Sequence, residues 1–245
     1  MNFVFQRETC STSEKAAVRA GLSLMDGVAP LTLAPSLFEL IALPPGTLQV
    51  DGRASIAPCP VGTVEFCRAW RHGLSIPEPA PLDYPPCLRA FLGREVRQHA
   101  DCSGIPVGQW IKPVRTKAWQ AQRVAPGAIP PSGGPVWSSE HLTLRGEFRV
   151  YVLADRVVGA GRYDDGADDE LAFDASVVDQ MIATYRAASE APAAYALDVA
   201  VLVDGRTILI EVTDAWAIGY YRGSLAPRNY VRMLWARWRA IAGVA

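Results

Sequence analysis

The stretch that decides the fold is residues 196–212, ALDVAVLVDGRTILIEV. The dipeptide Asp204-Gly205 separates two apolar runs, and Asp-Gly in this setting is a strong signal for a β-hairpin. If these two residues form the loop, Val203 faces Arg206, and Asp198 then lies opposite Glu211 on the same face of the sheet.

Two carboxylates that face each other across a hairpin repel each other and destabilise it. One interpretation is a solvated edge, where the repulsion costs little. The other is a divalent cation between Asp198 and Glu211, with Asp214 at the end of the strand as a third oxygen donor. Hard oxygen ligands of this kind suit Mg²⁺ that also binds the phosphates of a substrate.

A second hairpin brings like charges of the opposite sign together. Residues 147–153 alternate between polar and apolar, and residues 157–163 return after a tight turn. With Asp155-Arg156 as the loop, Arg149 faces Arg162. With Ala154-Asp155 as the loop, Arg162 faces Glu147 instead. Both registers predict Arg149 and Arg162 on one face, where they are either ordinary surface arginines or a binding site for phosphate or carboxylate.

Lysine is scarce in this chain of 245 residues. Of its 24 basic residues 21 are arginines, and the three lysines are Lys15, Lys112 and Lys117. We expect Lys15 to have no role in a functional site. Lys112 and Lys117 are either solvated surface lysines or part of a binding site for phosphate. Together with the arginine pair and the carboxylates, they would surround a metal-bound polyphosphate, which is the charge arrangement that phosphoryl transfer requires.

The order and spacing of several motifs resemble the ATP-grasp superfamily, most closely the small bacterial and phage clade named for an arginine and two lysines. The motifs are WIKP at 110–113, Lys117, VWSSE at 136–140, EFRVYV at 147–152, YALDV at 195–199 and IEVTDAWAIG at 210–219. Residues 83–85 and 91–94 also resemble the region that precedes this domain in the clade. The resemblance implies an α+β fold with two α/β subdomains that grip ATP between antiparallel sheets, at 106–245. An N-terminal α/β region would occupy 1–105.

The same resemblance implies roles for individual residues. Lys112 and Lys117 would contact the phosphates and the base region of ATP, and Glu140 would belong to the hinge that holds adenine and ribose. Arg149 and Arg162 would stabilise the γ-phosphate or an acyl-phosphate, so that Lys112, Arg149 and Arg162 form the catalytic set. The loop at 126–135 would cover the triphosphate. Mg²⁺ would be held by Asp198, Glu211 and Asp214, although the family usually has Glu-x-Asn where this chain has Glu-Val-Thr-Asp at 211–214.

The implied reaction is ATP-dependent ligation of a carboxylate to an amine through an acyl-phosphate, which forms an amide or peptide bond. The substrates would be ATP and a small-molecule or peptide carboxylate and amine, while the oligomeric state is unknown. Two alternatives remain. One is a phosphotransferase that acts on an acceptor other than a carboxylate, and the other is a binding or scaffold protein with a degenerate ATP-grasp fold.

Composition excludes several other classes of protein. A net charge of −1 and a pI near 6.3 argue against nucleic-acid binding. We find no apolar run of membrane-spanning length and no signal peptide, and we expect a cytoplasmic protein without a membrane partner. The five cysteines are scattered and have no CxxC pair, so we expect reduced thiols rather than a zinc site. The motifs GxSxG, GxGxxG and GxxxxGK[ST] are absent.

The remaining pattern predicts a strand within 2–7 and helices at 14–20, at 64–72 after the cap Thr63, and after Asp174. Residues 88–96 have the spacing of a short amphipathic helix. The apolar stripe of residues 229–241 predicts a helix packed on the domain, with a membrane-surface or nucleic-acid helix as the alternatives.

Overall fold

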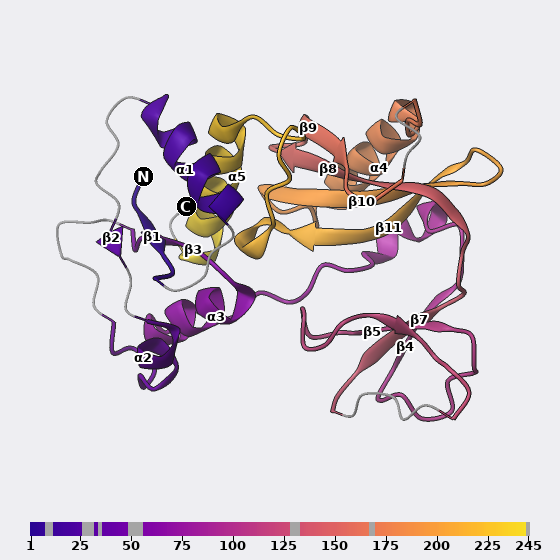
Figure 1. Ribbon diagram of the computed structural model, residues 1–245, viewed down its shortest axis with the longest axis horizontal. Coiled ribbons are helices and arrows are strands. Elements are labelled where there is room, and N and C mark those ends of the chain that lie inside the picture. The colour runs from indigo at the N-terminus through magenta and orange to yellow at the C-terminus, as the bar shows by residue number, and fades with distance from the viewer. Residues whose placement is uncertain are drawn as a thin grey trace.

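The computed structural model describes residues 1–7, 12–25, 32–33, 36–48, 56–127, 133–166 and 170–243. Within these residues the strands form three sheets, which we call the N-terminal, middle and C-terminal sheets (Figure 1). The elements in chain order are β1 (Phe3–Phe5), α1 (Thr12–Ser23), β2 (Thr32–Leu33), α2 (Leu37–Ile41), β3 (Cys59–Val61), α3 (Val64–Gly73), η1 (Pro86–Phe91), β4 (Val96–His99), β5 (Trp110–Pro113), β6 (Gln122–Arg123), β7 (Val136–Ser139), β8 (Leu144–Leu153), β9 (Arg156–Arg162), α4 (Ala175–Ala187), β10 (Ala194–Leu202), β11 (Thr207–Asp214), η2 (Ala215–Ala217) and α5 (Pro227–Ile241).

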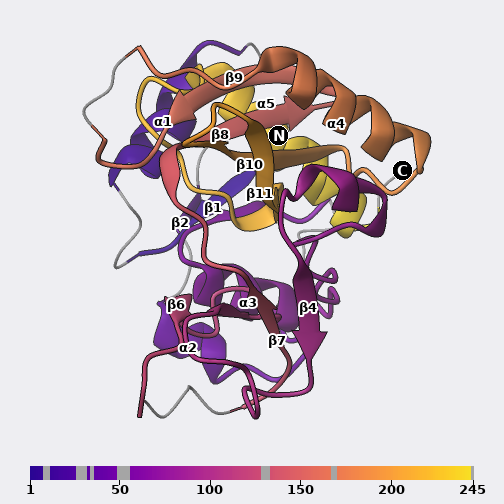
Figure 2. The same ribbon diagram turned by 90° about the vertical axis from the view of Figure 1, so that its right-hand side faces the viewer.

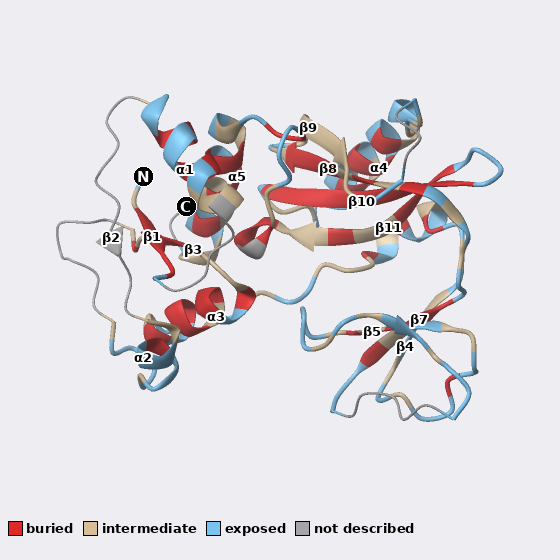
Figure 3. Cartoon of the chain, viewed as in Figure 1, coloured by how far each residue is buried: buried red, intermediate tan, exposed pale blue. Residues whose placement is uncertain are grey.

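The C-terminal sheet has the antiparallel order β11-β10-β8-β9. Every residue of the central strand β10 is buried, as Figure 3 shows. Alternate residues of β10, among them Tyr195 and Leu197, pack against α4 through Val178 and Met181. The other face of the same strand carries Asp198, so the core beneath α4 fixes the plane from which the carboxylate projects.

The predicted pairing of Asp198 with Glu211 is confirmed, although the loop differs from the expected one. The amide of Leu202 donates to the carbonyl of Arg206, so the loop has three residues, 203–205, instead of two. A bulge next to Asp198 then shifts the register by one residue. Because the two deviations cancel, the carboxylates still face each other.

Of the two loops predicted for the other hairpin, Ala154-Asp155 is confirmed, but both predicted partners of Arg162 are wrong. The two loop residues are both in the left-handed region, with φ of 47° and 60°. A register shift between Tyr151 and Val152 then pairs Arg149 with Gly161 and Arg162 with Phe148. Because successive strand residues point to opposite faces, Arg162 lies on the other face of the sheet from Arg149.

The middle sheet has the order β4-β7-β5-β6 and lies apart from the C-terminal sheet in both views (Figures 1 and 2). The helix expected at 88–96 is wrong: η1 ends at Phe91, and Val96 begins β4. Gly93 has a φ of 62°, and a Cβ on it would approach Ile208 to 2.6 Å, so the chain turns here instead of continuing a helix. The strand β4 lies before residue 106, where the second region was expected to begin, yet it pairs with β7 of the middle sheet.

The N-terminal sheet β2-β1-β3 is parallel and shares its core with α1, α3 and α5. The expected strand, the two expected helices and the cap at Thr63 are confirmed, as is the cap at Asp174. The C-terminal helix is packed on the domain: Val231, Leu234 and Trp238 are buried, and the indole of Trp238 donates to the carbonyl of Ala57 at 2.6 Å.

None of the described helices is long and apolar enough to cross a membrane. Four cysteines have free thiols, namely Cys59, Cys67, Cys87 and Cys102. Cys10 lies outside the described residues.

Candidate active site

Lys112 lies at the point where the middle and C-terminal sheets approach each other. Its Nζ is 2.6 Å from a carboxylate oxygen of Asp83 and 2.5 Å from one of Glu211, and it lies 5.0 Å from the centre of the Tyr84 ring. Burial opposes the charge on Lys112, but Glu211 and the other neighbours outweigh it and hold the pKa well above its ordinary value. Lys112 is therefore a fixed positive charge at the junction of three segments of the chain.

Asp83 holds these segments together, and the sequence pattern assigned it no role. Its backbone carbonyl accepts the amide of Val212 at 2.8 Å, and its second carboxylate oxygen accepts the indole N–H of Trp137 at 3.0 Å. Its φ of 35° is unusual for a residue with a side chain. Burial raises the pKa of Asp83, and the Lys112 ammonium opposes this effect only in part. No local sequence motif predicts the role of Asp83, because its partners come from strands that are distant in the sequence.

Arg149 and Asp198 form a bidentate ion pair on the face of the C-terminal sheet opposite α4. Nε and Nη2 of Arg149 each donate to one oxygen of Asp198 at 2.7 Å, and the hydroxyl of Thr213 donates to the same carboxylate at 3.0 Å. Asp198 is 1% exposed. The carboxylate of Asp198 keeps the pKa of Arg149 well above its ordinary value despite the opposing effect of burial.

Two tyrosines lie beside the guanidinium of Arg149, and the sequence pattern singled out neither of them. The centres of the Tyr163 and Tyr221 rings lie 5.6 and 5.3 Å from its central carbon, and the rings stack on each other. This distance suits a cation–π interaction. Among the described residues no group accepts a hydrogen bond from Nη1 of Arg149, so this donor remains for a ligand.

Glu211 completes the cluster from β11. Burial alone would raise the pKa of Glu211, but the neighbouring Lys112 outweighs burial and lowers it. Thr213 follows two positions later and therefore shares its face. The period of two could have pointed to Thr213 from the sequence, since it occupies the position of the family's usual Asn.

Among the described residues neither Arg162 nor Asp214 is hydrogen-bonded to this cluster, although Asp214 lines the cavity beside Lys112 and Glu211. Arg162 binds Asp164 at 2.7 Å on the opposite face of the sheet. In the strand alternation Asp214 shares the face of Val212, not that of Glu211. Its two carboxylate oxygens accept hydrogen bonds from Arg237 at 2.7 and 2.6 Å. One of these oxygens also accepts the amide N–H of Trp216 and so caps η2. Within the described part of the chain, no three His, Cys, Asp or Glu side chains form a group that could hold a metal ion.

This placement yields a test of Asp214. Asp214→Asn removes a buried ion pair, so we expect the free energy of unfolding to fall by about 3 kcal/mol. We expect the affinity for MgATP to stay within about threefold of the unmodified protein, since the strand alternation places Asp214 off the face that carries Asp198, Glu211 and Thr213. Thermal denaturation and calorimetry measure the two quantities, and a tenfold or greater loss of affinity in a folded variant would restore Asp214 as a ligand.

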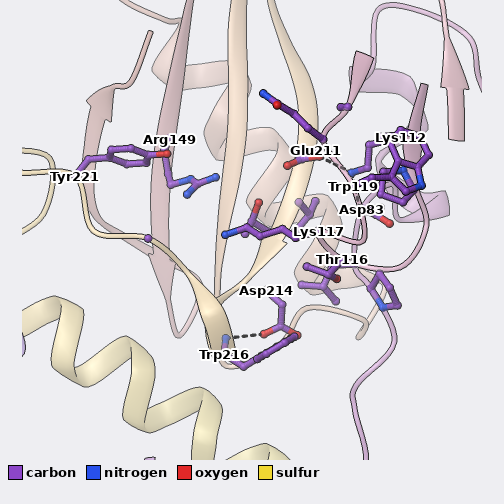
Figure 4. A pocket seen from close by; sticks show the side chains of 18 residues that line it. Asp83, Lys112, Thr116, Lys117, Trp119, Arg149, Glu211, Asp214, Trp216 and Tyr221 are labelled. Carbon is purple, nitrogen blue, oxygen red and sulfur yellow. Dashed lines mark hydrogen bonds and ion pairs between the residues drawn. The ribbon is translucent and has the colours of Figure 1, made fainter. Parts of the chain in front are cut away.

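Two cavities flank Lys112 and Glu211, and both residues line each of them. The larger, of about 570 Å³, lies between the turn after β5 and the end of β11. Figure 4 shows it with Lys112 and Asp83 on one side and Arg149 and Tyr221 on the other. The smaller, of about 310 Å³, is lined by the link between β7 and β8 and by the aromatic residues Tyr84 and Trp110.

The other predicted residues lie along these cavities. Lys117 is exposed on the turn after β5, has a φ of 53°, and lines the larger cavity. Glu140 is exposed at the end of β7 and lines the smaller one. Residues 128–132 of the expected covering loop lie outside the described residues.

The donor set fits one Mg²⁺ that shares its ligands with a polyphosphate. Asp198 and Glu211 face each other, and the Thr213 hydroxyl lies beside them. Mg²⁺ usually takes one or two protein carboxylates and completes its shell with water and phosphate oxygens. Two carboxylates would be enough for such an ion, while Asp214, the third one predicted from the sequence, accepts two hydrogen bonds from Arg237.

Comparisons with known proteins agree with this geometry. Residues 91–233, more than half of the chain, match a family of ATP-grasp domains, the second family of the clade named for an arginine and two lysines. A D-alanine–D-alanine ligase from Bacillus anthracis in complex with ATP superposes with a TM-score of 0.59 at 11% identity, over 100% of this chain and 98% of the ligase. An ATP-grasp RimK domain protein from Sphaerobacter thermophilus gives 0.57 at 12% identity, over 100% and 99%.

The ATP-grasp ligase PsnB, solved with a variant of its minimal precursor, Mg and ADP, gives a TM-score of 0.53 at 14% identity, over 96% of this chain and 98% of PsnB. Comparison with curated protein sequences gives no match. At these identities the structures establish the fold alone, and they confirm the α+β ATP-grasp fold expected from the sequence motifs.

Proposed function

Because the chain belongs to the ATP-grasp domains of the clade named for an arginine and two lysines, we propose that it is an ATP-dependent carboxylate–amine ligase. The observation that supports this most is the set of charges between two antiparallel sheets. Lys112 and Arg149 lie there beside Glu211 and Asp198, with a cavity on either side. An arrangement of fixed cations and carboxylates in a partly dry cleft is what phosphoryl transfer requires.

In this proposal the two cavities bind different parts of the substrates. The smaller cavity, with its aromatic rings and the Glu140 link, suits adenine and ribose. The larger cavity carries Lys117 and Arg149 and suits the triphosphate and the acceptor carboxylate. Lys112 lies between the two cavities, where it would give up its contact with Glu211 and bind a phosphate oxygen instead.

Asp198 and Glu211 would hold Mg²⁺, with Thr213 in the position of the usual Asn. When bound, the ion neutralises negative charge on the phosphates. Asp198 also binds Arg149 through two hydrogen bonds, so it orients the guanidinium. Arg162 stays outside the proposed set because it faces the other side of the sheet.

In the proposed reaction an oxygen of the acceptor carboxylate attacks the γ-phosphorus of ATP, and the bond to the β-phosphate oxygen breaks to release ADP. Arg149 and Lys117 stabilise the charge on the transferred group. The nitrogen of the amine then attacks the acyl carbon, inorganic phosphate leaves, and the amine loses a proton as the amide forms. Water that reached the acyl-phosphate would hydrolyse it, so the proposed reaction requires the cleft to exclude water while the intermediate is present.

A screen for ADP release tests this proposal. The panel contains single amino acids and short peptides as carboxylates and amines, since PsnB and the macrocyclase MdnC have been solved with precursor peptides. We expect ADP release only when a carboxylate and an amine are both present, with one amide per ADP. ADP release with a hydroxyl acceptor alone would favour the phosphotransferase, and the absence of ATP binding would favour the scaffold protein.

A further inference from the structure

The turn after β5 that carries Lys117 is held from outside the middle sheet. Nη2 of Arg68, on α3, donates to the carbonyl of Thr116 at 2.7 Å. The Arg68 side chain is only 14% exposed. A hydrogen bond from a charged donor is among the stronger hydrogen bonds in proteins. The position of Lys117, the next residue, therefore depends on a helix of the N-terminal region.

Arg68 is itself held in place by Glu78. Its Nε lies 3.0 Å from both oxygens of Glu78, and the same carboxylate lies 3.3 Å from Nη2 of Arg71. We call Arg68, Glu78 and Arg71 the bracket. A carboxylate between two guanidiniums fixes both side chains at one spacing.

The other end of the bracket reaches the opposite wall of the larger cavity. Arg71 is 1% exposed, donates to the carbonyl of Pro77 at 3.1 Å, and stacks on the ring of Trp216 at 4.4 Å. Trp216 lies in η2, which follows β11 directly, and both Trp216 and Thr116 line the larger cavity. Figure 4 shows Lys117 near the middle of that cavity, Thr116 on the side of Asp83, and Trp216 at the bottom beside Asp214. The bracket thus joins the turn of the middle sheet to the end of the C-terminal sheet.

The turn has a strained backbone conformation, which the bracket stabilises. Lys117 has a φ of 53°, which a residue with a side chain adopts only at a cost in energy. Besides the bond from Arg68, the hydrogen bonds of the turn are those of Val114 to Pro135 and of Ala118 to Arg115, within the described residues. Without the bracket the turn could relax, and the ammonium of Lys117 would lose its place in the cavity.

We propose that the bracket positions Lys117 for the phosphates of the nucleotide, so that the N-terminal region sets nucleotide affinity through residues that do not touch it. This proposal rests on the nucleotide site proposed above. Arg68 is a positioning residue in this account, and its effect passes through Lys117.

A double-mutant cycle on MgATP affinity tests the proposal. Calorimetry compares the full-length unmodified protein with Arg68→Gln, Lys117→Ala and the double variant. We expect Arg68→Gln to weaken binding about tenfold, the size expected for a lost charged hydrogen bond. We expect the double variant to bind as Lys117→Ala does alone. Affinity losses that multiply in the double variant, or an unchanged affinity in Arg68→Gln, would overturn the proposal.

Further variants separate positioning from folding. Arg68→Lys keeps a charged donor and is expected to recover most of the affinity. If Arg68→Gln does not fold, Glu78→Gln takes its place in the cycle, because it removes the carboxylate that holds Arg68. Arg115→Gln changes an arginine on the same turn that lies outside the bracket and is expected to bind within about twofold of the unmodified protein. If Arg115→Gln weakened binding as much as Arg68→Gln, the proposal would be wrong. If the unmodified protein bound no MgATP, the proposed function itself would fall.

Discussion

Lys112→Met is expected to lower the free energy of unfolding by about 3–5 kcal/mol and to abolish MgATP binding. The variant keeps the volume of the side chain but leaves Asp83 and Glu211, which are 15% and 30% exposed, without their counter-charge. The phosphates would also lose the cation that lies between the two cavities. Chemical denaturation and calorimetry measure the two effects.

The loss of stability should depend on pH in a defined direction. Without Lys112, burial raises the pKa of both Asp83 and Glu211 above their values in the unfolded chain. The folded variant then binds more protons than the unfolded one, so its stability should rise as the pH falls through these raised pKa values. In the unmodified protein Lys112 lowers the pKa of Glu211, and that contribution to stability is lost on acidification.

Lys15→Met is the matched control, because it removes one of the two other lysines by the same chemical change. Lys15 lies on α1, away from the cleft, and its replacement is expected to change stability by less than about 0.5 kcal/mol. If Lys112→Met were as stable as this control, or bound MgATP as the unmodified protein does, the assignment of Lys112 would be wrong.

Arg149→Gln is expected to reduce ligation, measured as ADP release with both substrates present, by about 10²–10³-fold. The variant removes the guanidinium that lies beside the proposed phosphate position and keeps a polar side chain on the strand. Asp198 loses its bidentate partner, so we also expect a decrease in stability of about 3–5 kcal/mol. ADP release should therefore be measured well below the melting temperature of the variant.

The comparison of binding with turnover shows whether Arg149 acts on the chemistry. We expect MgATP to bind within about tenfold of the normal affinity, because Lys112 and Lys117 remain. Arg156→Gln, at the exposed turn of the same hairpin, is the control and should leave turnover unchanged. Normal turnover in a folded Arg149→Gln would contradict the proposed role.

The pairing of Asp198 with Glu211 could be predicted from the sequence because two independent signals, the Asp-Gly turn and the alternation of apolar residues, indicate the same register. The predicted loop is one residue too short, yet the bulge beside Asp198 compensates for it. In the second hairpin a single register shift moves Arg162 to the other face. Alternation carries no information about where an extra residue enters a strand, so this error could not be avoided from the pattern alone.

Residues that join distant segments were the hardest to predict. Asp83 binds Lys112, Trp137 and the backbone of β11, and its importance emerges only when three segments are folded together. Tyr163 and Tyr221 act on Arg149 in the same way, from the residue after β9 and from the segment before α5. Thr213 differs from these, since the period of two places it beside Glu211.

Calorimetric titration of the full chain with ATP, with and without Mg²⁺, tests the central claim most directly. The proposed site predicts one nucleotide bound per chain in the presence of Mg²⁺, with binding lost in Glu211→Gln and retained in Asp214→Asn. No binding of MgATP by the unmodified protein, or equal binding by Glu211→Gln, would contradict the site between the two sheets.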